Sequence, residues 1–289
     1  MNLLTQINDK FSKFSKGQKL IANFITEHYD KAAFMTASKL GVTVGVSEST
    51  VVRFATELGY DGYPKMQKAM QEMIRDKLTS VQRIEVTKAR FAGEDILSSV
   101  LNQDIEKIRK TLDETSKEDF EQAVKAIAKA KTIYIFAVRS SAALASFLGY
   151  YYSLIFENVK VISNYGSTEI YEKLFRISPE DVIIGISFPR YSNAAVKAMT
   201  FAQRRGARVI AVTDSMTSPL CALSDYVLIA KSDMASVVDS LVAPLSMINA
   251  LIVATIIELG NEVENTFSRL EHIWGEYDVY RSKSEEEQQ

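Results

Sequence analysis

Five apolar runs, each followed by a polar loop and then by a stretch with helical spacing, constrain the second half of this chain more than any other feature. The runs are IYIFAV (133–138), VKVIS (159–163), DVIIGIS (181–187), RVIAVT (208–213) and YVLIA (226–230). Strands that are apolar along their whole length are buried on both faces, and strands that alternate with helices pair in parallel. The pattern therefore predicts an α/β, doubly wound domain with a five-stranded parallel sheet.

Serine side chains gather where two of these runs end. Ser140 and Ser141 follow the first run, and Ser187 and Ser192 follow the third. In open parallel sheets, ligands bind outside the carboxyl ends of the strands. We therefore expect a ligand site at this edge of the sheet.

The N-terminal part of the chain is predicted to be an all-α bundle. Ser15 and Gln18 form a capping box ahead of an apolar helical pattern. A further helix is expected to start at Thr36, Gly45 supplies a tight turn, and Ser47 caps the next helix. Two short helices joined by a turn that contains glycine match a helix-turn-helix.

In a helix-turn-helix, the N-terminal end of the second helix enters the major groove of DNA. Hydroxyls there reach phosphates, an arginine pairs with guanine, and lysines neutralise phosphates. The predicted DNA-binding residues are Ser47, Glu48, Ser49, Thr50, Arg53, Lys65 and Lys68. The alternative is a helical hairpin whose lysines form a solvated face.

The charge distribution agrees with a polyanion partner for the first part of the chain. Residues 1–90 hold 14 Lys and Arg against 9 Asp and Glu, whereas residues 91–289 hold 20 against 27. A basic segment on an acidic remainder indicates that only the first part meets nucleic acid.

The stretch GVSESTVVRFATELGYDGYPKMQKAM resembles the helix-turn-helix signature of RpiR-type bacterial transcriptional regulators. The signature positions are occupied by Ser47, Thr50, Arg53, Phe54, Leu58, Gly59, Tyr60, Gly62 and Tyr63. Gly41 departs from the pattern, since these regulators usually carry Ala there. The resemblance implies a DNA-binding regulator with double-stranded operator DNA as its partner.

The second half resembles the sugar isomerase (SIS) domain, which follows the helix-turn-helix in these regulators. The best-matching segment is GARVIAVTDSMTSPLCALSDYVL (206–228). The resemblance implies a flavodoxin-like fold that binds an anionic sugar-type effector, such as a sugar phosphate, and controls genes of carbohydrate metabolism. In the family, the loop after the first strand and a Ser-x-Ser-Gly-x-Thr loop hold the phosphate.

Ser187-Phe188-Pro189-Arg190-Tyr191-Ser192 stands at the Ser-x-Ser-Gly-x-Thr position. Pro189 removes a hydroxyl and a backbone donor, whereas Arg190 replaces glycine with a guanidinium that can grip an oxyanion. Arg139 is expected at the same edge, where two cations repel each other unless an anion joins them. The predicted effector-binding residues are Arg139, Ser140, Ser141, Ser187, Arg190 and Ser192. The alternative is a degenerate loop that is kept for folding.

We expect four regions along the chain. They are a helix-turn-helix domain at 1–78, a linker and connecting helix at 79–115, the SIS domain at 116–262, and a C-terminal tail at 263–289.

The sequence predicts a regulator and not an enzyme. His28 and His272 are interpreted as structural or exposed, and Glu169 is the best-placed carboxylate for a base but is more simply a solvated helix residue. We find no catalytic triad, metal-ligand cluster or nucleotide fingerprint, so neither a metal nor a cofactor is predicted. The alternatives are a phosphosugar isomerase with an accessory helical N-terminal domain, and an assembly scaffold.

A homodimer or homotetramer built through the SIS domains is expected, because paired helix-turn-helix units read two half-sites. The apolar segment 241–259 offers a seam through Met247, Ile248, Leu251 and Ile252. Its polar interruptions favour a buried helix over a membrane span. With a single cysteine, Cys221, and no secretory signal, the chain is predicted to be cytoplasmic.

Overall fold

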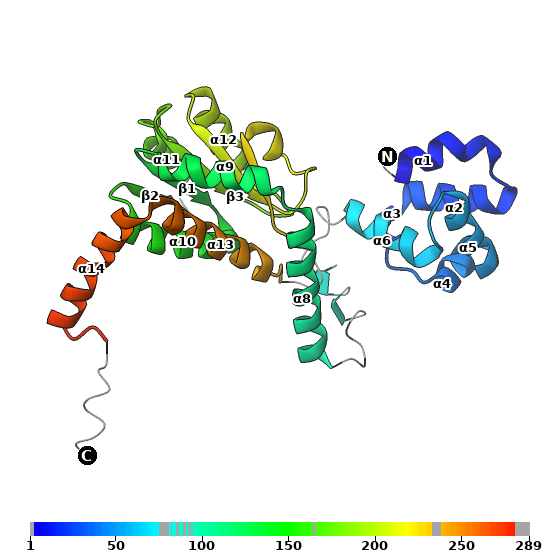
Figure 1. Cartoon of the computed structure of the whole chain (residues 1–289). Helices are drawn as coiled ribbons and strands as arrows, with labels where there is room; N and C mark the ends of the chain where they lie inside the picture. The colour runs from blue at the N-terminus through cyan, green and yellow to red at the C-terminus, as the bar shows by residue number, and fades with distance from the viewer. Residues whose placement is uncertain are drawn as a thin grey trace, which may run out of the picture. The chain divides into compact units, whose positions relative to one another are not determined.

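The computed structural model describes residues 3–74, 81, 83–84, 87–88, 91, 93, 95–163, 166–232 and 238–280. The chain divides into two compact units, Met1–Gly93 with Met234–Val238, and Glu94–Asp233 with Asp239–Gln289 (Figure 1). We call them the N-terminal unit and the C-terminal unit, and each is described by itself.

The N-terminal unit is helical over its described elements. In chain order these are α1 (Leu3–Lys10), η1 (Phe11–Lys13), α2 (Lys16–Glu27), α3 (Tyr29–Ala32), α4 (Ala37–Val44), α5 (Glu48–Glu57) and α6 (Tyr63–Ile74). Their apolar faces meet in one core that includes Ile21, Ile25, Leu40, Val51 and Phe54.

The predicted start signals of these helices are confirmed. The Ser15 hydroxyl accepts from the Gln18 N–H, and the Gln18 side chain accepts from the Ser15 N–H, so the capping box of α2 is complete. Thr36 caps α4 by accepting from the Lys39 N–H at 3.1 Å.

Helices α4 and α5 approach each other closely at Gly41. The Val46 N–H donates to the Gly41 carbonyl at 2.8 Å, and Gly45 turns the chain with a left-handed φ of 76°. A Cβ added at Gly41 would lie 2.8 Å from the Val46 carbonyl oxygen, which belongs to the backbone. The turn therefore packs directly against Gly41, the residue that departs from the RpiR pattern, and leaves no room for a Cβ there.

The C-terminal unit contains the predicted five-stranded sheet. Its strands are β1 (Ile133–Ala137), β2 (Val159–Ile162), β3 (Val182–Ile186), β4 (Arg208–Thr213) and β5 (Tyr226–Ile229). All pair in parallel in the order β2-β1-β3-β4-β5, which is the flavodoxin-like order.

Helices cover both faces of the sheet, as a doubly wound fold requires. The C-terminal unit contains α8 (Ile96–Glu114), α9 (Lys117–Ala128), η2 (Arg139–Ser141), α10 (Ala142–Ile155), α11 (Ser167–Leu174), α12 (Asn193–Arg204), η3 (Cys221–Leu223), α13 (Val242–Leu259) and α14 (Asn261–Glu276). Helices α9, α10 and α13 pack on one face, and α11 and α12 pack on the other (Figure 1).

The residues predicted to form a subunit contact on the apolar segment 241–259 are wrong. Met247, Ile248, Leu251 and Ile252 of α13 are buried in the core of their own unit. At the centre of this packing, the hydroxyls of Tyr152 on α10 and Thr255 on α13 lie 3.0 Å apart, and burial raises the pKa of Tyr152. The side of α13 that is left uncovered carries Val253 and Ile257 instead.

Within the described residues, α13 is long and apolar enough to cross a membrane. The mean hydropathy of its 18 residues is 1.9, and 39% of this helix is buried inside the protein. A core helix that lies against a sheet passes the same test, so the signal is weak.

Parts of the predicted linker, including residues 79–80, 82 and 85–86, lie outside the described residues, as do residues 281–289 of the predicted tail. The helix α8 belongs to the C-terminal unit, and much of the stretch assigned to the tail forms α14. The four domain boundaries stay predictions.

Gly41→Ala is expected to destabilise the N-terminal unit. Alanine favours a helix over glycine by about 1 kcal/mol, but the collision with the Val46 carbonyl forces a backbone shift that costs about 1–3 kcal/mol. Gly17→Ala is the matched control, because its added Cβ meets only side-chain methyls at 3.4 Å.

Native-state hydrogen exchange of the amides in α4 and α5 measures the difference in the full-length chain. Faster exchange in Gly41→Ala, with unchanged or slower exchange in Gly17→Ala, is the predicted result. Equal or slower exchange in Gly41→Ala contradicts the close approach.

Candidate DNA-binding helix and effector-binding edge

The N-terminal end of α5 presents a cluster of hydroxyl groups. The Ser47 hydroxyl lies 2.9 Å from that of Ser49 and 2.8 Å from that of Thr50, and it accepts from the Thr50 N–H at 3.3 Å. Ser47, Glu48 and Ser49 are exposed, whereas Thr50 is half-buried. The cluster both caps α5 and leaves donors at the surface where a phosphate would sit.

Arg53 lies one turn into α5 and is exposed, between the buried residues Val51 and Phe54. Its side chain therefore lies outside the core that Phe54 and Leu58 help to form. The structure brings Arg53 and the hydroxyl cluster together on one helix, whereas Lys65 and Lys68 are exposed on α6.

Several signature residues have structural roles. Phe54 and Leu58 are buried in the core, and Gly59 and Gly62 adopt positive φ after α5. The Tyr63 hydroxyl donates to the Met35 carbonyl at 2.7 Å just before α4, and burial raises the pKa of Tyr63 to about 12. Tyr63 thus fixes the segment that leads into the helix-turn-helix.

The predicted effector residues lie on two loops that follow neighbouring strands. Strand β1 pairs with β3 so that Ala137 is opposite Ile186, and the loops begin directly after these residues. The strand order reverses between β1 and β3, which is the position where such sheets bind ligands. Arg139, Ser140 and Ser141 form the first loop, and Ser187, Arg190 and Ser192 lie in the second.

Both arginines hold a left-handed backbone. Arg139 has φ 60° and Arg190 has φ 62°, and both side chains are exposed. A non-glycine residue in this conformation costs about 1 kcal/mol or more, and such residues cluster at functional sites. Arg190 therefore holds a backbone conformation that favours glycine, while its side chain adds a guanidinium.

Hydrogen bonds of two serine hydroxyls hold the backbone of the loop after β3 in place. The buried Ser187 hydroxyl accepts from the Ser192 N–H at 3.3 Å, and the Ser192 hydroxyl caps α12 by accepting from the Ala194 N–H at 3.1 Å. Both hydroxyls therefore shape the turn as acceptors. Each still carries a proton that can be donated to an anion.

Thr213, at the end of β4, ties this loop to the next one. Its buried hydroxyl donates to the Ser187 carbonyl at 2.9 Å and is hydrogen-bonded to the Ser218 hydroxyl at 2.8 Å. Thr213 and Ser218 belong to the segment 206–228, which is the part of the chain that best matches the SIS domain. That motif therefore supports the edge, a role that was not predicted from the sequence.

Tyr191 was also missed as a site residue. Its hydroxyl donates to the carboxylate of Asp214 at 2.6 Å, and Asp214 is buried. The sequence signal was a bulky aromatic residue in a turn that is expected to hold an anion, where small residues and free amides are favoured.

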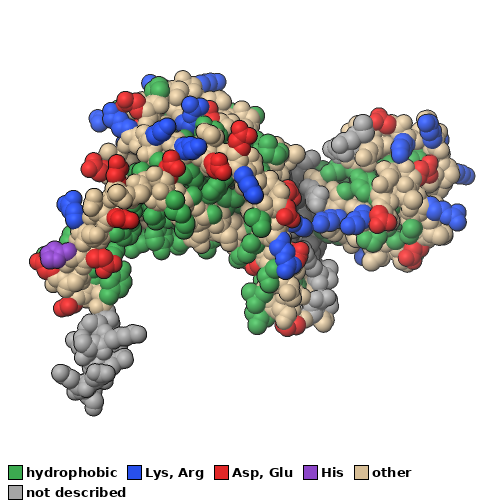
Figure 2. Space-filling model, viewed as in Figure 1, with side chains coloured by type: hydrophobic (Ala, Val, Ile, Leu, Met, Phe, Trp, Pro, Cys, Tyr) green, Lys and Arg blue, Asp and Glu red, His purple; other side chains and the backbone are tan. Residues whose placement is uncertain are grey.

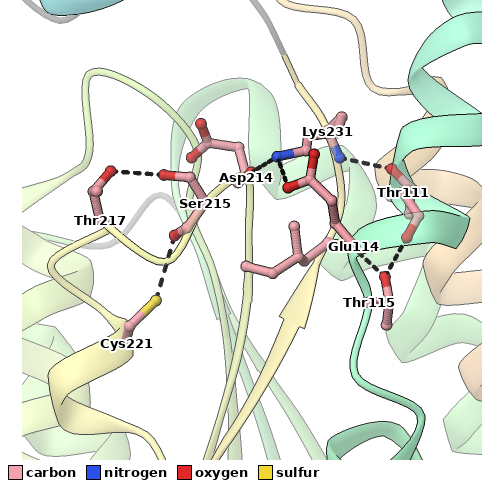
Figure 3. A network of polar contacts seen from close by, with 9 residues as sticks. Thr111, Glu114, Thr115, Asp214, Ser215, Thr217, Cys221 and Lys231 are labelled. Carbon is pink, nitrogen blue, oxygen red and sulfur yellow. Dashed lines mark hydrogen bonds and ion pairs between the residues drawn. The ribbon is translucent and has the colours of Figure 1, made fainter.

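A polar network continues from Asp214 to α8 (Figure 3). The Lys231 ammonium donates to the Asp214 carbonyl at 3.3 Å and forms an ion pair with Glu114. The Lys231 N–H donates to the Thr111 hydroxyl at 2.8 Å. The end of α8 is therefore connected to the carboxyl edge of the sheet through one lysine.

Two further hydrogen bonds lie at the ends of this network. The Thr115 hydroxyl donates to the Ile229 carbonyl at 2.8 Å, which ties the helix end to β5. On the other side of the network, the Cys221 thiol donates to the Ser215 carbonyl at 3.4 Å, and burial raises the pKa of that thiol.

The groups considered for isomerase chemistry have other roles. The Glu169 carboxylate accepts from the Gly166 N–H at 2.9 Å at the start of α11. His28 packs edge-on against Phe24, with ring centroids 5.2 Å apart, and His272 is exposed on α14. Among the described residues, no group of three or more His, Cys, Asp or Glu side chains could hold a metal ion.

Comparison with protein families and known proteins identifies both halves of the chain. The helix-turn-helix domain of the rpiR family matches residues 1–77, and the SIS domain matches residues 126–254. An uncharacterized HTH-type transcriptional regulator from Haemophilus influenzae is 24% identical over 230 residues, which cover 79% of each chain. The name of this relative agrees with the prediction of a regulator and not an enzyme.

Two solved structures resemble the chain. The sugar isomerase domain of an RpiR transcription factor from Sphaerobacter thermophilus gives a TM-score of 0.59 at 29% identity, covering 62% of this chain and 99% of that chain. NanR from Vibrio vulnificus, solved in complex with ManNAc-6P, gives a TM-score of 0.57 at 20% identity, covering 97% and 100%, which is a likeness of fold. The chain therefore belongs to the RpiR family of transcriptional regulators, in which an rpiR-type helix-turn-helix domain is followed by a SIS domain.

Proposed function

We propose that this protein binds double-stranded operator DNA through α5 and changes its DNA affinity when an anionic sugar-type metabolite binds between the loops after β1 and β3. The observation that carries the proposal is the pair of arginines with left-handed backbones, Arg139 and Arg190, on loops that follow neighbouring strands. Guanidinium groups bind phosphate and carboxylate oxygens in bidentate geometry, so the effector is an anion.

A sugar phosphate is the class of effector that fits best. The hydroxyls of Ser140, Ser141, Ser187 and Ser192 line the same two loops and supply neutral donors beside the two cations. NanR, which shares the fold, was solved with a sugar phosphate, ManNAc-6P. Control of carbohydrate-metabolism genes would follow from such an effector.

The proposed regulator is a cytoplasmic homo-oligomer. The outward sides of α10 and α13 carry Tyr150, Val253 and Ile257, which are 57%, 56% and 73% exposed. Helix α10 has no charged residue and α13 has only Glu258. Figure 2 shows hydrophobic side chains gathered over these helices, as expected for a surface that a second copy covers.

Arg53→Ala is expected to weaken operator binding by about 1–3 kcal/mol if Arg53 reads a base. Folding should not change, because the side chain is exposed. The measurement is operator titration at several salt concentrations, with Lys31→Ala as a control that removes an exposed charge from α3. An Arg53→Ala protein that binds the operator as tightly as wild type removes Arg53 from the interface.

Arg190→Ala is expected to lower effector affinity about ten- to a hundredfold, since it removes a charge-assisted hydrogen bond. The effector is first found by a thermal-shift screen of sugar phosphates, sugar acids and inositol-type compounds, because a true ligand stabilises the folded state. Operator titration with and without that compound then measures the coupling. DNA binding without the compound should equal that of wild type.

The matched control is Arg204→Ala, which removes an exposed arginine at the opposite end of α12 from the loop. Arg204→Ala should respond to the effector as wild type does. If Arg190→Ala responds at the same effector concentration as wild type, the loop after β3 is only a connection between a strand and a helix.

Tyr191→Phe is expected to reduce the coupling with a smaller loss of effector affinity. The substitution removes the hydroxyl that donates to Asp214, whose carbonyl accepts from Lys231, the partner of Glu114 on α8. If this network carries the signal, bound effector changes DNA affinity less in the variant than in wild type. Calorimetric effector titration and operator titration separate the two effects, and an unchanged coupling excludes this route.

A further inference from the structure

The last turn of α5 is held by residues that precede the helix-turn-helix in the chain. The Gln18 side-chain amide donates to the Glu57 carboxylate, and the Lys10 ammonium donates to the Glu57 carbonyl at 2.7 Å. Gln18 lies in the first turn of α2, and Lys10 is the last residue of α1. Glu57 is therefore attached to α2 through its side chain and to α1 through its backbone.

Gln18 uses both ends of its amide group. Its side-chain oxygen accepts from the Ser15 N–H at 2.9 Å, which completes the capping box, while its side-chain nitrogen donates to Glu57. The side chain of Gln18 is buried, with 8% exposure, and both contacts fix its orientation. A glutamate at this position would keep the cap but would place a second carboxylate against Glu57.

The residue before Gln18 contacts the other end of α5, and α2 lies beside α5 (Figure 1). Gly17 packs so close to α5 that an added Cβ would lie 3.4 Å from the Thr50 side chain. Glu57 follows Thr50 by seven residues, which is about 10 Å along a helix. The first turn of α2 therefore contacts α5 at the hydroxyl cluster and again at its last turn.

The hydrogen bond restricts α5 in a way that its core contacts do not. Core side chains of α5 such as Val51 and Phe54 make apolar contacts, which have no preferred direction. A hydrogen bond weakens steeply when its angle changes, so the contact between Gln18 and Glu57 resists sliding and rotation of the helix. Arg53 lies one turn before Glu57, and the placement of its guanidinium therefore depends on the same contact.

We infer that Gln18 is a positioning residue for DNA recognition, because its hydrogen bond to Glu57 fixes α5 where Arg53 and the hydroxyl cluster reach the bases. The inference rests on the proposed binding of DNA through α5. Specific contacts need side chains that are held within about 0.5 Å of the productive geometry, whereas non-specific binding depends on charge. Loss of the hydrogen bond is therefore expected to reduce selectivity for one sequence more than affinity for DNA in general.

Binding of the full-length chain to two DNA duplexes measures the effect. One is the duplex that the wild type selects from a random-sequence library, and the other has the same composition in scrambled order. The ratio of the two affinities reports selectivity. Gln18→Glu is expected to lower this ratio about tenfold, because two carboxylates repel each other where a hydrogen bond was made. Gln18→Met removes the donor without adding a charge, should lower the ratio as well, and decides the outcome if Gln18→Glu does not fold.

Exchange of the two groups is the rescue experiment. In Gln18→Glu combined with Glu57→Gln, the amide introduced at position 57 donates to the carboxylate introduced at position 18, which still accepts from the Ser15 N–H. The net charge equals that of the wild type, and the ratio should return to within about twofold of the wild-type value. Asn23→Asp is the matched control, since it adds the same charge at an exposed position of α2 and should leave the ratio unchanged.

A purely structural role of Gln18 gives a different result. Thermal unfolding of each variant shows which of them retain the fold. If Gln18→Glu lowers the affinity for both duplexes by the same factor, or for neither, the inference is overturned. A ratio that stays low after the exchange also overturns it, because the loss then does not come from the hydrogen bond.

The wild type alone tests the function on which the inference rests. If the wild type selects no sequence, operator recognition through α5 and the role of Gln18 are both overturned. If the wild type selects a sequence and Gln18→Glu keeps the same ratio, only the role of Gln18 is overturned.

Discussion

Strands β1 and β3 lie side by side in the sheet although α10, β2 and α11 separate them in the chain. Parallel pairing gives every strand the same direction, so the loops after β1 and β3 leave the sheet at the same edge. The helices that follow, α10 and α12, pack on opposite faces of the sheet. The chain thus diverges at this point and leaves the two loops open to a ligand.

The loop after β3 is shaped by contacts that a ligand does not need to supply. Ser187, Ser192 and Thr213 fix its backbone, and Arg190 keeps a left-handed conformation at its tip. Such pre-organisation lowers the entropy lost on binding. From the same loop, Tyr191 contacts Asp214, and Lys231 connects the Asp214 backbone to α8. A shift of this loop would therefore act on the helix that begins the C-terminal unit.

Local sequence patterns predicted the strands, the helix caps and the helix-turn-helix, because each depends on residues close together in the chain. The capping box at Ser15 and the caps at Thr36 and Ser47 needed only three or four residues to be recognised. The pattern of strands and loops also indicated the edge at which the serines meet, and the resemblance to SIS domains implied the flavodoxin-like strand order.

Contacts between distant residues could not be predicted in this way. Tyr191 and Asp214, or Lys231 and Glu114, meet only because the sheet brings their loops and helices together. The wrong side of α13 was chosen because a helix that is apolar all round has no periodicity to show which side faces the core. On α8, only the structure shows that apolar side chains such as Leu97, Leu101 and Leu112 are exposed.

The proposed effector site lies between the loops after β1 and β3, where an anionic sugar metabolite is expected to bind. Hydrogen–deuterium exchange of the full-length protein, with and without ManNAc-6P or the sugar phosphate found by screening, tests it most directly. Bound sugar phosphate is expected to slow the exchange of the amides in residues 139–142 and 187–194, which form that edge and begin the helices that follow. Protection confined to other loops, with these two unchanged while the compound is bound, would contradict it.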